Sequence, residues 1–374
     1  MSPFIFLTDA QKYTDDTLSV YRSLLGLTLH FMCNTKYLIL NCSPFYYLSP
    51  CLYFILIMSL TVTHKEPSKL LVLAAFAALY IIWGSTYLGI VVAIRSIPPF
   101  FMLGTRFAVA GLILLAWCLL KGEKLPSVQT FFTIGVGGLL MLFIGNGAVT
   151  FAEQYLPSGL AAIIVATVPL WFILLDKRQW QYNFSNSKII AGIVIGFAGV
   201  LLLFAGKGTA DFTADRIKLI SFVVLIVGTI GWAVGSLFSK YKDVTASVTM
   251  KAAVQMVVAG FVAIGTGFLL HEQTGFAMSN VSLESFFALL YLIVMGSLVA
   301  DMSYIWLLSV RPASLVGTYA YVNPVVAVFL GWLIANEAIT TQQVIALAVI
   351  LAGVILVNFT KGSLKAVKEI AGHE

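Results

Sequence analysis

The stretch RPASLVGTYAYVNPVVAVFLGW, residues 311–332, carries two prolines twelve positions apart in an otherwise apolar run. About 155 residues earlier the chain reads LPSGLAAIIVATVPLWFILLDK, residues 156–177, with the same proline spacing. The prolines of the two stretches align, Pro157 with Pro312 and Pro169 with Pro324. A pattern written twice in this way predicts an internal duplication.

The composition of the 374-residue chain is that of a membrane protein. Hydrophobic residues make up 60% of it and charged residues 10%, whereas an ordinary soluble domain is about 25% charged. A helix that crosses the bilayer core needs about 20 apolar residues. Uncharged windows of that length recur at residues 70–94, 128–152, 219–239 and 312–336.

We predict ten transmembrane helices, because the apolar residues are consecutive and do not alternate as in the strands of a membrane barrel. Their ranges are 70–94, 98–120, 129–151, 157–175, 189–206, 218–239, 247–270, 284–308, 312–334 and 341–359. The predicted fold class is therefore an all-α integral membrane protein.

The distribution of Lys and Arg predicts the orientation of these helices. If the first helix runs outward, fourteen basic residues fall in inner loops and tails and only four in outer loops. Both ends of the ten-helix core are then cytoplasmic. The net charge of +6 reflects this same bias. Without a basic patch interleaved with aromatic residues, it gives no reason to expect a nucleic-acid partner.

Five helices in each half is an odd number, so the second half enters the membrane from the opposite side. Residues 64–210 are predicted to form the first repeat, and residues 211–374 the second repeat with a cytoplasmic tail. Two further pairs of segments match, AGIVIGFAGVLLL (191–203) with ALAVILAGVILV (346–357) and RFAVAG (106–111) with QMVVAG (255–260). Inverted repeats are the recurring architecture of secondary transporters. A duplication by itself can also reflect only the evolutionary origin of the fold, in a protein that transports nothing.

Few polar residues lie inside the predicted helices, and the repeat pairs most of them. Asn146 aligns with Asp301, and Arg106 aligns with Gln255. An ionised group at the bilayer centre costs about 2.5 to 3.5 kcal/mol on insertion scales, so it is expected to face the helical interior or a wet cavity. We predict that these four residues, with Asn323, line a substrate path.

Each of these polar residues also has a structural interpretation. Arg106 could form an ion pair with Glu153 that fixes helix packing, and Asp301 could lie near enough to the inner surface to be hydrated. Asn146 and Gln255 could hydrogen-bond neighbouring helices, an interaction worth about 0.6 kcal/mol on average in membranes.

Aromatic residues and prolines add a second group of candidates. Trp83 and Tyr87 share one face of the first helix, Trp232 aligns with Trp83, and Tyr319 precedes Asn323. These aromatic residues either wall the substrate path or serve as packing and interfacial anchors. Each mid-helix proline, Pro169 and Pro324, frees a backbone carbonyl and is a candidate hinge or a fixed kink.

The sequence supports neither catalysis nor a cofactor. The four histidines lie outside the predicted helices of the ten-helix core, no hydrolase, zinc-protease or phosphate-loop motif occurs, and the cysteine spacing matches no metal site. We therefore predict a protein that is not an enzyme, with the lipid bilayer and a small-molecule substrate as partners. Energy would come from a gradient, with Glu153 or Asp301 as a possible proton carrier. The residues do not indicate an oligomeric state.

Five segments together resemble the EamA-type ten-helix permeases of the drug/metabolite transporter superfamily. They are YIIWGSTYLGI, PPFFMLGTRFAVAG, GNGAVTFAEQYLPSGLAAIIVATVPLW, GWAVGSLFSK and TYAYVNPVVAVFLGW. The resemblance covers residues 70–360. It implies two five-helix repeats, cytoplasmic termini, a central cavity, and export of amino acids, related metabolites or drugs across a bacterial cytoplasmic membrane. The chain departs from the pattern after the fourth helix, where LLDKRQW replaces a frequent Gly-Glu, while Glu337 follows the ninth.

Residues 1–63 stand apart from this scheme as an N-terminal extension. They hold Cys33, Cys42 and Cys51 and an apolar run interrupted by prolines. We interpret the extension as upstream translation ahead of a start at Met58, or as an additional hydrophobic segment. Two other functions remain open for the chain as a whole: a membrane-embedded enzyme that modifies lipid, and a receptor or assembly partner without transport.

Overall fold

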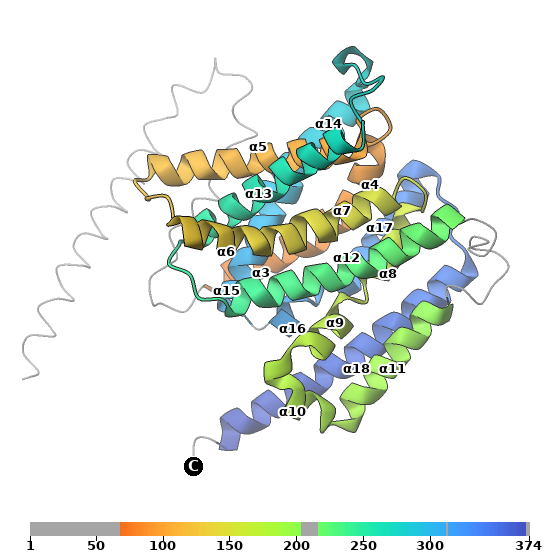
Figure 1. The fold of residues 1–374 in the computed structure, drawn as a ribbon. Coiled ribbons are helices and arrows are strands. Elements are labelled where there is room, and N and C mark those ends of the chain that lie inside the picture. The colour runs from red at the N-terminus through yellow and green to blue at the C-terminus, as the bar shows by residue number, and fades with distance from the viewer. Residues whose placement is uncertain (1–67, 203–215, 312, 372–374) are drawn as a thin grey trace, which may run out of the picture. The chain divides into compact units, whose positions relative to one another are not determined.

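The computed structural model describes residues 68–202, 216–311 and 313–371, and every regular element in these ranges is a helix (Figure 1). The N-terminal extension lies outside the described residues. Seven of the helices are long and apolar enough to cross a membrane. Three shorter apolar helices, Ser187–Leu202, Val322–Ala335 and Thr341–Leu356, bring the apolar helical segments of the described ranges to ten. The prediction of an all-α membrane protein is confirmed.

The first five spans come from the first repeat. They are span 1, with α3 (Lys69–Ala78), η3 (Leu79–Trp83) and α4 (Gly84–Ala93); span 2, α5 (Pro99–Leu120); span 3, with α6 (Val128–Gly138), η4 (Leu139–Gly145) and α7 (Asn146–Ala152); span 4, with α8 (Ser158–Val165) and α9 (Val168–Leu175); and span 5, α11 (Ser187–Leu202). The short helices η5 (Lys177–Gln179) and α10 (Trp180–Phe184) connect spans 4 and 5.

The second repeat supplies the other five spans. They are span 6, α12 (Arg216–Tyr241); span 7, α13 (Val248–Leu269); span 8, with α14 (Leu283–Tyr291), η7 (Leu292–Asp301) and α15 (Met302–Val310); span 9, with α16 (Ala313–Val316) and α17 (Tyr319–Ala335); and span 10, α18 (Thr341–Ala371). The 3₁₀ turn η6 (Met278–Asn280) precedes span 8.

Serine and proline residues mark where spans begin. Ser68, Ser127, Ser247 and Ser282 precede spans 1, 3, 7 and 8, and each hydroxyl oxygen accepts a hydrogen bond from a backbone N–H in the first turn. Such N-caps satisfy N–H groups that have no partner within the helix. Spans 2 and 4 instead follow Pro98 and Pro157.

Equivalent helices of the two repeats pack against each other in antiparallel directions. A methyl group built on Gly104 of α5 would meet Ile264 of α13, and one built on Gly111 would meet Val257. The contact therefore moves down α13 as it moves up α5, and the two helices lie side by side in Figure 1. Helices α11 and α18 are also antiparallel neighbours, through contacts of Gly199 and Gly353. This arrangement is the one that inverted repeats require.

Repeat-related carboxylates tie the ends of the α5–α13 pair together. Glu272, which follows α13, accepts hydrogen bonds from the backbone N–H groups of Phe100 and Phe101 in the first turn of α5, each at 3.0 Å. Glu123, which follows α5 at the equivalent position, accepts a hydrogen bond of 2.7 Å from Ser247 at the start of α13. Each helix is thus anchored by a residue that follows its partner.

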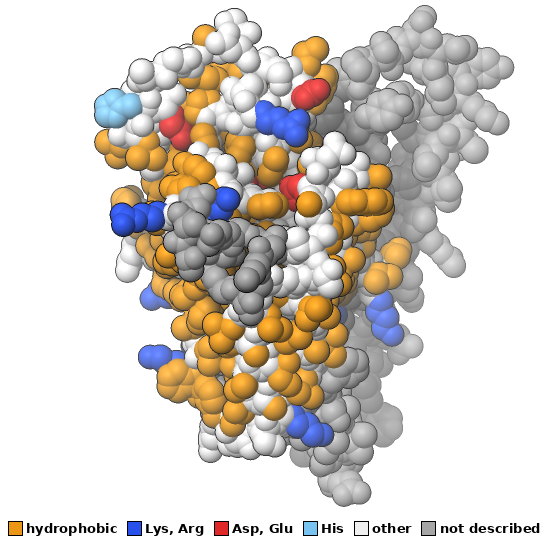
Figure 2. Space-filling view, turned by 90° about the vertical axis from the view of Figure 1, so that its right-hand side faces the viewer, with side chains coloured by type: hydrophobic (Ala, Val, Ile, Leu, Met, Phe, Trp, Pro, Cys, Tyr) orange, Lys and Arg blue, Asp and Glu red, His pale blue; other side chains and the backbone are white. Residues whose placement is uncertain are grey.

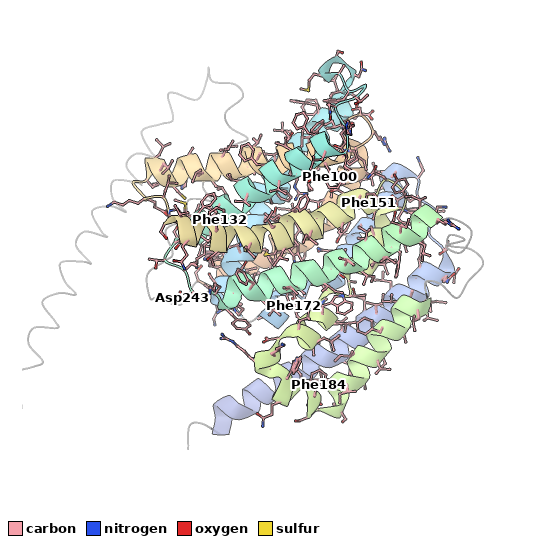
Figure 3. The ribbon with its side chains drawn as sticks, viewed as in Figure 1. Phe100, Phe132, Phe151, Phe172, Phe184 and Asp243 are labelled. Atoms are coloured by element: carbon pink, nitrogen blue, oxygen red, sulfur yellow. The ribbon has the colours of Figure 1, made fainter. Side chains whose placement is uncertain are left out.

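The spans run between two common ends, which labelled residues mark in Figure 3. Phe132 of α6 and Asp243, which follows α12, lie at one end of the helices, whereas Phe100 and Phe151 lie at the other (Figure 3).

Hydrophobic side chains cover much of the face in Figure 2, with few charged groups among them. An apolar face of this extent is expected where helices meet lipid.

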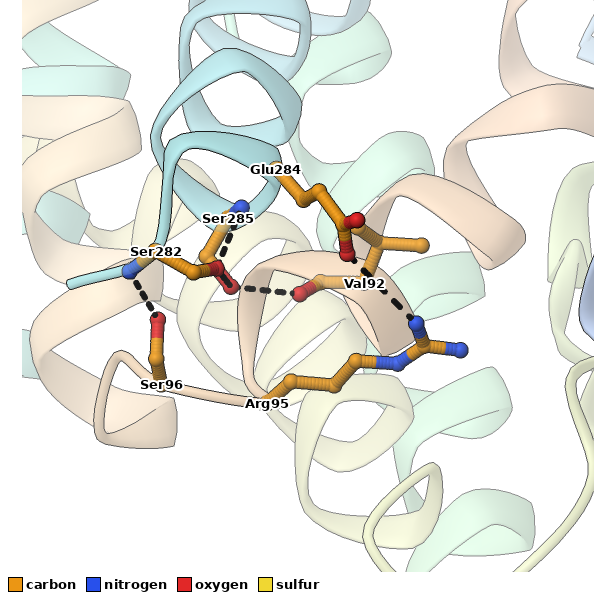
Figure 4. Close-up of polar contacts among 6 residues, drawn as sticks. All are labelled: Val92, Arg95, Ser96, Ser282, Glu284 and Ser285. Carbon is orange, nitrogen blue, oxygen red and sulfur yellow. Dashed lines mark hydrogen bonds and ion pairs between the residues drawn. The ribbon is translucent and has the colours of Figure 1, made fainter.

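Figure 4 shows how spans 1 and 8 are joined at the end that we predict to be outside. The buried Ser285 hydroxyl donates to the carbonyl of Val92 at 2.8 Å, and the Ser282 N–H donates to the Ser96 hydroxyl at 3.0 Å. Arg95 and Glu284 form an exposed ion pair with an N–O distance of 3.9 Å.

Candidate functional site

Three spans contain a π-helical segment near their middle. The segments are η3 in span 1, η4 in span 3 and η7 in span 8, and the last two lie at equivalent positions of the repeats. A π-helical turn holds an extra residue and leaves backbone groups with altered partners, which is why such turns are frequent at functional sites. Here the segments end at Trp83, immediately before Asn146, and at Asp301.

Asp301 is buried between a cation and an indole. Its Oδ1 accepts a hydrogen bond of 2.9 Å from Trp83 Nε1, and its Oδ2 lies 3.6 Å from Nη2 of Arg106. Arg106 also donates from Nε to the Ser297 hydroxyl at 2.9 Å. Both charged side chains are 2% exposed. Asp301 is therefore not hydrated at the inner surface, and Arg106 has Asp301, not Glu153, as its ion-pair partner.

Four aromatic side chains form a cluster where the two repeats meet. Trp83 of span 1 contacts Trp232 of span 6 edge to face, with ring centroids 5.4 Å apart. These tryptophans are repeat equivalents, so their contact lies on the pseudo-twofold axis. Tyr304 of span 8 and Tyr319 of span 9 pack on Trp83 at 5.0 and 4.8 Å. We name Trp83, Trp232, Tyr304 and Tyr319 the aromatic partition.

Hydrogen bonds fix the aromatic partition in place. The Tyr304 hydroxyl shares hydrogen bonds of 3.2 Å with Trp232 Nε1 and 2.7 Å with the Ser236 hydroxyl. Buried polar atoms of aromatic side chains normally find such partners. Because Trp83 also donates to Asp301, three of the four rings are oriented by polar contacts and not by packing alone.

A first cavity, the Asn146 cavity, has a volume of about 60 Å³ and extends from the partition toward the predicted outer ends of the spans. Its lining comes from spans 1, 3, 4, 6 and 9, and none of the described residues in it is charged. The polar lining residues are Thr86, Tyr87, Asn146, Thr229 and Asn323, and the aromatic floor consists of Trp83, Trp232 and Tyr319. A cavity of this size holds a few water molecules.

A second cavity, the lysine cavity, has a volume of about 280 Å³ and lies toward the predicted cytoplasmic ends. Spans 3, 6, 7 and 8 form it, together with the connection between spans 6 and 7. Lys240, Lys242 and Lys251 line it, and Gln255 lies one helical turn beyond Lys251. The two cavities thus occupy opposite halves of the spans, on either side of the aromatic partition.

Asn323 supports the π-helical segment of span 1. With its amide nitrogen turned toward the neighbouring carbonyl groups, it donates to the backbone oxygens of Leu79, Tyr80 and Tyr319 at 3.2, 3.1 and 3.0 Å. The altered hydrogen bonding of η3 is thereby satisfied from span 9.

The two mid-span prolines lie near interruptions of their helices. Span 4 is broken at Ala166–Thr167, two residues before Pro169. Span 9 is broken at Gly317–Thr318, whereas Pro324 lies inside α17. The interruptions therefore fall at different distances from the two prolines.

Glu153, in the loop after span 3, is a buried carboxylate without a hydrogen bond. The residue is 6% exposed, and neither carboxylate oxygen has a hydrogen-bond partner among the described residues. Burial raises the pKa of Glu153 well above its ordinary value; nearby Glu337 raises it further, and Arg106 opposes the shift. Glu337 itself caps α8, accepting hydrogen bonds from the Ser158 N–H, the Ser158 hydroxyl and the Gly159 N–H.

The structure brings most of the predicted site residues together, but not on one surface. Asn146, Asn323, Trp83, Tyr87, Trp232 and Tyr319 line the Asn146 cavity. Gln255 lines the lysine cavity. Arg106 and Asp301 line neither cavity and instead support the partition from behind.

Sequence reasoning missed Tyr304 and the three lysines of the lysine cavity. Tyr304 follows Asp301 by three residues, which places both on one helical face, so a signal for it was present. The distribution of lysines in the sequence predicts only the orientation of the helices, not a cavity that they share.

Comparison with known proteins gives consistent matches over the ten-span region. The chain matches the EamA-like transporter family over residues 68–205 and 219–359. An uncharacterized inner membrane transporter of Escherichia coli K12, YedA, is 39% identical over 289 residues, which cover 77% of this chain and 90% of the relative. A chloroplastic WAT1-related protein of Arabidopsis thaliana is 24% identical over 286 residues, covering 76% of this chain and 68% of the relative.

A solved crystal structure of another protein shares the fold. Its TM-score is 0.55 at 19% sequence identity, and the match covers 77% of this chain and 97% of the other. At that identity the likeness concerns the fold alone.

Proposed function

This chain belongs to the EamA-like transporter family, and from that membership we propose that it exports small metabolites across the inner membrane of a bacterium. The solutes would be amino acids, related compounds or drugs, and a solute or ion gradient would drive export. One relative, YedA, is named as an inner membrane transporter. The membrane transporter class follows from the family; solute, direction and mechanism are our proposal.

The observation that carries the mechanism is the pair of cavities separated by the aromatic partition. The Asn146 cavity lies on one side of the Trp83–Trp232 contact and the lysine cavity on the other. Because this contact joins equivalent residues of inverted repeats, exchanging the packing of the two repeats would turn the opening of the solute path from one side of the membrane to the other. Alternating access in inverted-repeat transporters has this symmetry.

Within this proposal the predicted site residues take different roles. Asn146, Asn323, Tyr87 and Gln255 contact solute; Trp83, Trp232 and Tyr319 form the barrier that solute must pass. Arg106 and Asp301 hold Trp83 in position. Pro169 and Pro324 make spans 4 and 9 the elements that bend.

Glu153 is our candidate for proton coupling. When a carboxyl group is buried without a hydrogen bond, its neutral form has a lower free energy than its charged form. The charged and titratable groups that face it are Arg106 of α5, Glu337 after α17 and Tyr87 of α4. Movement of Arg106 toward or away from Glu153 would change its proton affinity. Asp301, already paired with Arg106, is less suited to this role.

Cysteine accessibility tests the two-cavity mechanism. The four native cysteines would be replaced by serine, and single cysteines placed at Asn146 and Ser309, which line different cavities. In intact cells, a membrane-impermeant maleimide should modify Asn146→Cys from outside and Ser309→Cys only after permeabilisation. Modification of both from the same side would contradict the two-cavity mechanism, whereas modification of Ser309→Cys alone from outside would contradict the cytoplasmic placement of the termini.

A resistance screen tests the transport function. Cells that overproduce the chain from Met58 should survive toxic amino acids or analogues at higher concentrations than control cells. Trp232→Ala should remove this advantage, because it opens the barrier between the cavities. Equal sensitivity across the whole panel would count against export of this class of solutes.

A further inference from the structure

The lysine cavity gathers positive charge without a matching carboxylate. Lys240 and Lys242 come from the end of span 6 and Lys251 from the first turns of span 7, and no Asp or Glu is among the described residues that line the cavity. Asp176 attracts Lys240 from outside the cavity wall, where it accepts a hydrogen bond of 2.8 Å from the Tyr241 hydroxyl.

The three lysines are not equally engaged. Lys240 donates to the carbonyls of Leu308 and Arg311 at 2.7 and 2.8 Å, which caps the end of α15. Neither Lys242 nor Lys251 forms an ion pair with a described residue. A cation near a helix N-terminus is unfavourable with respect to the helix dipole, so the stability of α13 does not explain Lys251.

A buried amide extends the polar wall inward. Gln255 Nε2 donates to the Ser239 hydroxyl at 2.9 Å, while its Oε1 is buried without a partner. Whichever way the amide is turned, at least one of its hydrogen-bonding positions has no partner among the described residues. The cavity also has apolar lining residues, among them Met141, Phe238 and Ile305.

The general preference for cytoplasmic lysine explains which end these residues occupy but not why three of them share one cavity. Other inner-loop lysines, such as Lys124 and Lys188, line neither cavity. A cavity whose lining combines lysine side chains, an amide and apolar residues fits a solute with an anionic group and an apolar body.

We propose that the lysine cavity is a binding site for small amphipathic carboxylates, whose carboxylate lies against Lys242 and Lys251. Its use as the cytoplasmic loading site of the transporter rests on the proposed function; the binding itself does not. Phosphate groups of anionic lipids offer similar chemistry, so the experiment separates the two sources.

The test measures equilibrium binding of hexanoate and of its uncharged analogue hexanamide to the full chain in phosphatidylcholine nanodiscs, by ligand-observed NMR. Hexanoate should bind about ten-fold more tightly than hexanamide, a ratio of the size expected for two partly exposed charge contacts. The variant Lys242→Gln/Lys251→Gln should bind the two ligands equally. The matched control Lys124→Gln/Lys188→Gln should keep the wild-type ratio.

Three results would overturn the assignment. They are equal binding of the two ligands by the wild type, an unchanged ratio in Lys242→Gln/Lys251→Gln, or a ten-fold loss of hexanoate affinity when phosphatidylglycerol is added, which would make lipid the occupant. Binding without export in liposomes would leave the site standing and reject the proposed function. Export by the wild type without any binding preference for the carboxylate would reject the proposed binding site and leave the proposed function standing.

Discussion

Arg106 and Asp301 form a buried ion pair that also orients Trp83, since Asp301 accepts the indole N–H while its second oxygen faces the guanidinium. The pair joins span 2 to span 8 and stands directly behind the aromatic partition. The geometry of this pair predicts that removing one charge lowers the free energy of unfolding, and that removing the second charge as well restores part of that loss.

Arg106→Gln should lower the free energy of unfolding by about 3 to 5 kcal/mol, because it leaves Asp301 buried without a counter-charge. The double variant Arg106→Gln/Asp301→Asn should be more stable than the sum of the single changes predicts, by about 2 kcal/mol. Unfolding in mixed micelles, followed by tryptophan fluorescence, measures both.

The exposed pair of Arg95 and Glu284 is the matched control (Figure 4). These side chains are 54% and 76% exposed, so Arg95→Gln should change stability by less than about 1 kcal/mol. Strict additivity at Arg106 and Asp301 would show that the two charges do not interact.

Glu153→Gln should remove a pH dependence of stability. The pKa of Glu153 is raised in the folded protein, so the folded state binds its proton more tightly than the unfolded chain does. Between the ordinary carboxyl pKa and the raised one, stability should therefore fall as pH rises. The neutral amide cannot titrate, so the variant should lose less stability over the same range.

Thermal unfolding of both proteins at several pH values from about 5 upward would show this difference. Glu284→Gln, an exposed glutamate, serves as the comparison and should follow the wild type. If Glu153 also carries protons during transport, export by Glu153→Gln should no longer respond to an imposed pH gradient. Parallel stability curves for wild type and Glu153→Gln would contradict the raised pKa.

The sequence predicted the helices and their duplication because apolar runs of bilayer length and repeated prolines are one-dimensional signals. Asn146 and Asn323, which the sequence singles out, line a cavity, and their part in a substrate path stays a prediction. The sequence did not show that Asn146 and Gln255 would line different cavities, nor that Arg106 and Asp301 would face each other behind the partition.

The reason is that a π-helical segment rotates the part of the helix that follows it about the helix axis. One residue inserted in a π-helical turn rotates the rest of the helix by about 100°, and such segments precede Asn146 and include Asp301. The hydropathy pattern does not reveal these insertions. The depth of a residue in the membrane could therefore be predicted from the sequence, but the direction of its side chain could not.

Glu272→Ala should destabilise the protein by about 1 to 2 kcal/mol, because α5 loses the acceptors of its Phe100 and Phe101 N–H groups. Glu284→Ala removes the same side chain from the first turn of α14 but breaks only an exposed contact. Its effect should stay within about 0.5 kcal/mol. Equal effects of the two changes on the unfolding midpoint would mean that Glu272 does not cap α5.

Gly260→Ala should destabilise the protein, whereas Gly265→Ala in the same helix should not. A Cβ on Gly260 would lie 2.3 Å from the backbone nitrogen of Ala108, while one on Gly265 would meet nothing within 4 Å. Backbone cannot yield as a flexible side chain does, so the first change should cost about 1 to 3 kcal/mol.

The control change should be neutral or stabilising by up to about 1 kcal/mol, since alanine favours helix over glycine. Gly260 ends the segment QMVVAG, and Gly111 ends its repeat equivalent RFAVAG, so Gly111→Ala should resemble Gly260→Ala. The melting temperatures of the three purified variants decide the matter. If Gly260→Ala melts with Gly265→Ala, the close antiparallel contact of α5 and α13 is wrong, and with it the inverted arrangement on which the two-cavity mechanism depends.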